Sequence, residues 1–175
     1  MIGHAMTDVH EALSARNWTV RHKLPPALAL PSVIVERYAR LPADVSNFVC
    51  SLAECRNATG DAWLFGCDDY ECVDADAFKW NEVELMSLGA VDGEVERKRI
   101  VDFWNGHFPF ALAVHSDYDY LAVSVDEAHF GAVVHGYAPE FEACEVIAPS
   151  FSRFLAELAA QAGLSTPAWP YNLFL

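Results

Sequence analysis

The sequence predicts one α+β domain in which helices cover one face of an antiparallel β-sheet meander. The chain has 175 residues, which suits a single domain. Three strand-like runs, near residues 108–115, 120–125 and 130–137, are separated by polar breaks of hairpin length. Helix-like periodicity lies before and after these runs and not between them, an order typical of α+β domains.

Apolar spacing predicts three helices in the first third of the chain. Thr7 can cap a short helix that carries Val9, Ala12 and Leu13 on one face, and Leu24-Pro25-Pro26 ends that region. A second helix is expected from Pro31 to about Tyr38. Pro42 suits the first turn of a third helix, whose apolar stripe has the i, i+3, i+4, i+7 spacing. The members of that stripe are Val45, Phe48, Val49 and Leu52.

The middle of the chain is predicted in less detail. Residues 55–61 are expected to form a loop, and residues 62–66 a short buried strand. Helices are expected within 78–88 and within 95–104, the second ending at Asn105-Gly106. The last helix is predicted from Pro149 to about Ala162, with Gly163 at its end. Its apolar stripe contains Phe151, Phe154, Leu155 and Leu158.

Composition favours a folded protein that binds basic partners. Hydrophobic residues make up 53% of the chain, and the net charge is −14. Such a charge repels nucleic acid and anionic membranes. No signal peptide and no apolar run long enough to cross a membrane is visible. The five cysteines are odd in number and fit reduced thiols, so a cytoplasmic location is expected.

Three groups of motifs have the order and spacing of a known family. The first is Leu41-Pro42, then Phe48, then a loop that contains Asn57. The second is residues 108–111, followed by Asp117-Tyr118 and residues 120–123. The third is residues 131–134, Glu140 and residues 147–155.

On these motifs the chain resembles the SUKH superfamily, which contains a yeast cell-wall-synthesis regulator and many bacterial immunity proteins. The resemblance spans roughly residues 31–160. It implies a SUKH-like domain over residues 24–175, with residues 1–23 as an N-terminal extension or short helix. It also implies a non-enzymatic domain that binds proteins, typically a toxin encoded by a neighbouring gene. One departure is that Asn57 is followed by Ala58, where many members have glycine.

Catalytic and metal sites are weighed against this interpretation. Pairs of carboxylates such as Asp74 with Asp76 could serve as acid and base, but 25 acidic residues produce such pairs by chance. The four histidines between His107 and His135 do not have the spacing of a metal-ligand set. The same is true of the two cysteine pairs, Cys50/Cys55 and Cys67/Cys72. We therefore expect no catalytic residue, no metal and no cofactor.

The distribution of charge indicates where a partner binds. No Lys or Arg occurs from Ile100 through Ser152, while eight acidic residues do. Two turn-like segments place a tyrosine among carboxylates, and tyrosine is enriched at binding hot spots. The predicted partner-binding residues are therefore Asp68, Asp69, Tyr70, Glu71, Asp117, Tyr118 and Asp119. The expected partner is a cognate toxin, plausibly a basic nuclease. The alternatives are a regulatory scaffold that binds a cellular protein and a small hydrolase or metal enzyme.

Overall fold

A computed structural model describes residues 2–25, 27, 29–71, 78–115 and 117–175, with side chains from residue 8 onwards. Within these residues the chain forms a seven-stranded antiparallel sheet whose spatial order follows the chain order, β1 to β7. The predicted α+β fold with an antiparallel meander is therefore confirmed. The strands are β1 Thr19–His22, β2 Leu52–Arg56, β3 Ala62–Leu64, β4 His107–Val114, β5 Tyr118–Ser124, β6 Val133–Tyr137 and β7 Glu145–Ala148.

The helices interrupt this meander at two places and flank it at both ends. They are α1 Ile2–Ala15, α2 Ser32–Arg37, α3 Ala43–Ser51, α4 Glu82–Gly89, α5 Glu94–Asn105 and α6 Phe151–Ala162, with short 3-10 helices η1 Cys67–Tyr70 and η2 Tyr171–Leu173. Insertions between β1 and β2 and between β3 and β4 carry α2 to α5. Among the described residues, no helix combines the length and the apolar character needed to cross a membrane.

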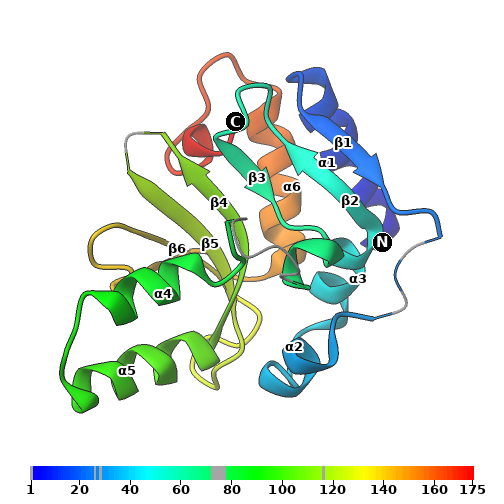
Figure 1. Cartoon of the computed structure of the whole chain (residues 1–175). Coiled ribbons are helices and arrows are strands. Elements are labelled where there is room, and N and C mark those ends of the chain that lie inside the picture. Colours follow the sequence, from blue (N-terminus) through cyan, green and yellow to red (C-terminus); the bar gives the residue numbers. More distant parts are fainter. Residues whose placement is uncertain (1, 26, 28, 72–77, 116) are drawn as a thin grey trace.

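Helices and aromatic side chains cover both faces of the central strands, not one face as expected. Consecutive residues of a strand point to opposite faces. Leu121 faces α6, where it lies beside Phe154 and Leu158. Its neighbour Tyr120 points the other way, and its ring lies 4.9 Å from that of Trp104 on α5. In Figure 1, α1 and α6 lie behind the sheet, while α4 and α5 lie in front at the lower left.

Helix α6 confirms the predicted C-terminal helix and its apolar stripe. Phe151, Phe154, Leu155 and Leu158 are all buried. The helix begins two residues later than predicted, because Ser150 is its N-cap and its hydroxyl accepts a hydrogen bond from the Arg153 N–H. The ring of Phe110 on β4 lies between those of Phe151 and Phe154, at 5.2 and 5.5 Å.

The N-terminal region is part of the domain and not an extension to it. Helix α1 lies against α6, and β1 pairs with β2 at the edge of the sheet. Val9, Leu13 and Trp18 are buried in the same core as the central strands. The predicted boundary at residue 24 therefore does not separate two structural units. Thr7 lies inside α1, so it is not the cap of this helix.

Strand β2 differs from the predicted loop at residues 55–61. Helix α3 ends at Ser51, and Leu52 is already extended with φ −95° and ψ 133°. Leu52 and Cys55 are buried from the strand, although Leu52 also continues the helical spacing of Val45 and Val49. A short apolar run fits the period of a helix as well as that of a strand. The sequence pattern therefore extends the predicted helix to Leu52, which the structure places in β2.

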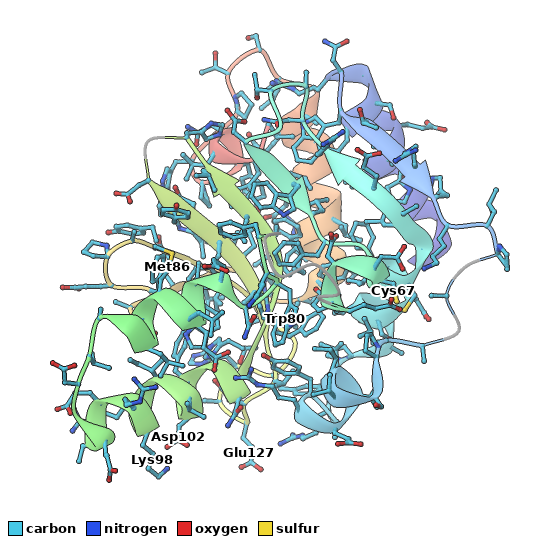
Figure 2. The ribbon with its side chains drawn as sticks, viewed as in Figure 1. Cys67, Trp80, Met86, Lys98, Asp102 and Glu127 are labelled. Carbon is cyan, nitrogen blue, oxygen red and sulfur yellow. The ribbon has the colours of Figure 1, made fainter. Side chains whose placement is uncertain are left out.

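An ion pair between Arg37 and Glu84 joins α2 to α4. Arg37 donates two hydrogen bonds of 2.8 Å to the carboxylate of Glu84, which is buried. Arg37 also donates to the side-chain oxygen of Asn105 at the end of α5. The guanidinium lies 5.6 Å from the ring of Trp80, which Figure 2 labels near the middle of the molecule. If the α4–α5 hairpin moved away from α2, the buried carboxylate of Glu84 would lose its partner, which is costly. The ion pair therefore favours the packed position of the hairpin.

Candidate partner-binding site

The two predicted binding segments lie at opposite ends of the sheet. Ala62 of β3 pairs with Ala113 and Leu64 pairs with Ala111. Residues 68–71 follow the Leu64 end, whereas residues 117–119 follow the turn beyond the Ala113 end. The structure therefore does not bring the seven predicted residues together into one surface.

Tyr70 is a core residue, so its predicted role as an exposed anchor is wrong. Its side chain is 2% exposed, and its hydroxyl donates a 2.8 Å hydrogen bond to the Pro109 carbonyl. Its ring stacks on Phe108 at 5.1 Å. The cause is the 3-10 turn of η1, which directs Tyr70 inward while its neighbours Asp68, Asp69 and Glu71 are exposed.

The exposed acids around η1 make internal contacts. Asp68 forms an ion pair with Lys23. Asp69 accepts a 2.7 Å hydrogen bond from the Gly66 N–H, which satisfies the start of η1. Because part of this charge is used within the chain, the η1 segment is the weaker of the two predicted binding segments.

The second segment, residues 117–119, contains three different environments. Asp117 is exposed and accepts a hydrogen bond from the Tyr118 N–H. Tyr118 is half-buried, and its ring stacks on Phe78 at 6.1 Å. Asp119 points to the α6 face of the sheet, where its Oδ1 lies 2.8 Å from Nε2 of His135. Asp119 thus leads to a cluster that sequence reasoning did not assemble.

This group, here the His135 cluster, consists of Asp119, His135, Tyr137, Glu145 and Trp169. Cross-strand pairing of Asp119 with Tyr137 and of His135 with Glu145 places four of its members on the same face of β5, β6 and β7. His135 is 1% exposed and forms the floor. The rings of Tyr137 and Trp169 lie 5.8 and 5.1 Å from the imidazole.

The C-terminal segment positions Trp169 over this floor. The Tyr171 hydroxyl donates to Glu157 of α6 at 2.6 Å, and the Ala168 N–H donates to Gln161 at 2.7 Å. His115 contacts the Leu173 carbonyl through Nε2 at 2.8 Å. Trp169 nevertheless remains 54% exposed, and Tyr137 remains 53% exposed. Two large aromatic side chains therefore present partly free surfaces at one place.

The His135 cluster is electronegative. Asp119 and Glu145 belong to it, and the exposed Glu140 follows Tyr137 closely in the chain. No ion pair with Lys or Arg is present at Asp119 or Glu145 among the described residues. Sequence reasoning identified Asp119 and the absence of bases here, but it missed His135, Tyr137 and Trp169. Alternation along β6 could have placed His135 and Tyr137 on one face, whereas no local pattern brings Trp169 to them.

The hydrogen-bonded Asp119–His135 pair resembles two members of a catalytic triad, and no third member is found among the described residues. The other ring nitrogen, Nδ1, has no hydrogen-bond partner and lies 3.9 Å from Glu145 Oε1. A nucleophile would need a hydroxyl or thiol at that nitrogen. The carboxylates and the half-exposed aromatic rings at this place can contact a basic partner.

Within the described part of the chain, the cysteines and the other histidines do not form a metal-ligand set. Cys50 and Cys67 are neighbours, with their sulfurs 3.9 Å apart, while burial raises the pKa of Cys55 to about 12. Cys72 lies outside the described residues. Over the part of the chain that the structure describes, no group of three or more His, Cys, Asp or Glu side chains could hold a metal ion.

A hollow of about 320 Å³ lies over β2 and β3, lined by residues that include Glu54, Arg56 and Trp63. Glu54 forms ion pairs with both Arg21 and Arg56, so the charges here compensate each other. Comparisons with known proteins return no match to this chain among family models, curated proteins or solved structures. The candidate function therefore depends on the geometry of the His135 cluster and on the motifs of the sequence.

Proposed function

We propose that this chain is a non-enzymatic protein-binding domain that acts in the cytoplasm as an immunity protein and neutralises a basic toxin. The observation that carries the proposal is the pair of half-exposed aromatic side chains, Tyr137 and Trp169, beside carboxylates that have no Lys or Arg partner among the described residues. Trp and Tyr dominate binding energy at protein interfaces, and a complementary charge accelerates association. The resemblance to SUKH immunity proteins supports the same function.

In the proposed binding mode, acidic and aromatic side chains have different roles. Exposed carboxylates such as Asp117, Glu140 and Glu145 attract a basic surface before contact. Tyr137 and Trp169 then supply the buried area that slows dissociation. A toxin that cleaves nucleic acid is a suitable partner, because the carboxylates would occupy the place of phosphates.

The decisive experiment is a binding measurement against the product of the adjacent gene. We expect the purified chain to form a stable complex with a basic toxin and to abolish its activity. Replacing both Tyr137 and Trp169 with alanine should weaken that complex by about 30-fold or more, the effect of removing a hot spot. Phe130→Ala is the matched control, because Phe130 is also half-exposed but lies at the opposite end of the β5–β6 hairpin.

A complex that tolerates the Tyr137/Trp169 double substitution would contradict this surface. If the flanking genes encode no toxin and the chain captures a cellular regulator instead, the scaffold alternative replaces the immunity function. The first outcome removes the aromatic surface from the proposal, whereas the second keeps the surface and changes only the partner.

A further inference from the structure

The hydrogen bond between Asp119 and His135 assigns a hydrogen to one nitrogen of the imidazole. Nε2 lies 2.8 Å from Asp119 Oδ1, and an ionised carboxylate can only accept. Nε2 therefore carries the proton, and in the neutral imidazole Nδ1 is left with a lone pair and no hydrogen. His135 is fully buried, so this orientation is held by the surrounding sheet.

The Nδ1 atom faces a second acceptor. Among the residues that the structure describes it is buried without a hydrogen-bond partner, and Oε1 of Glu145 lies 3.9 Å away. Two lone pairs that face each other repel unless a donor lies between them. The Glu145 side chain is 54% exposed and can turn outward at low cost, whereas His135 cannot move. The site thus opens from the Glu145 side.

The surroundings select the kind of donor that fits. Tyr137 and Trp169 lie against the imidazole and are each about half exposed, and exposed aromatic faces attract cations. Asp119 and Glu145 add negative charge without a Lys or Arg partner among the described residues. A guanidinium has several N–H donors in one plane and can serve two acceptors at once.

We propose that the His135 cluster is a binding site for an arginine side chain of the partner, whose guanidinium donates to His135 Nδ1 and Glu145 beside Tyr137 and Trp169. This inference rests on the proposed function, because it assigns the chemistry by which the same surface recognises a basic protein. It deepens that function by naming one residue type and one anchoring point.

The test uses the full chain and a small probe, Nα-acetyl-L-arginine methylamide. Nitrogen-15 NMR should show one protonated and one unprotonated nitrogen in free His135. The probe should shift the Nδ1 resonance and the Trp169 indole N–H in a saturable way. The citrulline analogue has the same shape without the charge and should produce no saturable shift.

Substitutions sharpen the test. Glu145→Gln should weaken binding of the probe by about fivefold or more, since a charge-assisted hydrogen bond is lost. Glu127→Gln removes the same charge from a side chain that is 91% exposed, and should leave binding unchanged. Figure 2 labels Glu127 at the lower end of the molecule, and it lies beyond the β5–β6 end that is opposite Tyr137.

Several outcomes would overturn the inference. They are an imidazole protonated on both nitrogens at neutral pH, equal binding of the citrulline probe, tighter binding of n-butylammonium, or equal weakening by Glu127→Gln. The failure of this inference is distinguishable from that of the proposed function. A toxin complex without probe binding removes only the arginine site, whereas probe binding without any toxin complex removes only the immunity function.

Discussion

At the scale of single residues, His10 shows how burial sets chemistry. The imidazole is buried on α1, its Nε2 has no hydrogen-bond partner, and its ring lies 4.6 Å from that of His22. Burial, and then the neighbouring His22, lower the pKa of His10 from 6.5 to about 4. The fold therefore favours the neutral form of this side chain.

This shift predicts a loss of stability in acid. Between pH 6.5 and about 4 the unfolded chain binds a proton on His10 that the folded chain does not, so stability is present above pH 6.5 and falls as the pH falls through 4. The contribution amounts to about 2–3 kcal/mol. Urea unfolding at several pH values should show it, and His10→Leu should flatten the slope in this window. An unchanged slope in the variant would assign the acid sensitivity to other groups, including His107, whose pKa burial also lowers.

Phe154 carries the residue-scale prediction about the core. Its side chain is fully buried, with the rings of Phe110 and Tyr171 at 5.5 and 5.9 Å. Phe154→Ala should reduce the free energy of unfolding by about 3–5 kcal/mol, because a cavity replaces a core aromatic ring. Phe130→Ala removes a half-exposed ring and should cost much less. Equal losses in denaturant titrations of the two variants would show that α6 is loosely held.

Three tyrosines mark what the sequence could and could not predict at this scale. Tyr70 and Tyr118 both have acidic neighbours in the chain, yet one is buried and the other half-buried, while Tyr137, between Gly136 and Ala138, is exposed. The charge of sequence neighbours does not determine the direction of a side chain. The 3-10 turn at Tyr70 and the strand pleat at Tyr137 determine it, and these depend on contacts far along the chain.

At the scale of elements, the turn between β2 and β3 is built around Asn57. Its side-chain oxygen accepts hydrogen bonds from the N–H groups of Gly60, Asp61 and Ala62, at 2.8, 3.0 and 3.2 Å. Gly60 has φ +77°, a conformation that favours glycine. The glycine that this turn requires is therefore three residues after Asn57 in the chain.

Asn57→Ala should therefore destabilise the domain by about 1–3 kcal/mol, because three backbone donors lose their acceptor. Thr59→Ala is the control, since the Thr59 hydroxyl makes one exposed hydrogen bond to Asp61 and should cost less. Thermal unfolding of both variants measures the difference. If the two melt at the same temperature, solvent replaces the Asn57 contacts and the turn is held by strand pairing.

The helices and strands differ in how well the local sequence predicts them. Helix α6 was predicted from its helical apolar stripe, and strands β4 to β6 from apolar runs bounded by polar breaks, although β6 begins at Val133 and not at residue 130. Strands β1 and β7 have four residues each, lie at the two edges of the sheet, and have no continuous apolar face. Their pairing partners define them as strands, so a local pattern does not suffice.

At the scale of the whole molecule, the basic residues are distributed unevenly. All but one of the eleven precede Ile100, so residues 100–175 are acidic with almost no compensation. The fold places the sheet half formed by β5, β6 and β7 within that acidic part, together with the His135 cluster. The sequence predicted this polarity correctly as a property of the chain. It could not predict that the meander would concentrate it beside Tyr137 and Trp169, because that requires the C-terminal segment to fold back over β6.

This uneven charge is expected to affect the rate at which the chain associates with its partner. Replacing Asp117 and Glu140 with Asn and Gln removes two exposed charges near Tyr137, and should slow association with the toxin about 3–10-fold at low salt. The salt dependence of the association rate should also become flatter. Tyr137→Ala should mainly speed dissociation, since it removes buried area and no charge.

The matched control is Asp8→Asn with Glu11→Gln on α1, which changes the net charge equally in the first half of the chain. Stopped-flow measurements at several salt concentrations separate the two explanations. If the control pair slows association as strongly, total charge steers the encounter and no particular face does; if only Asp117 and Glu140 matter, the β5–β7 surface is where the partner arrives.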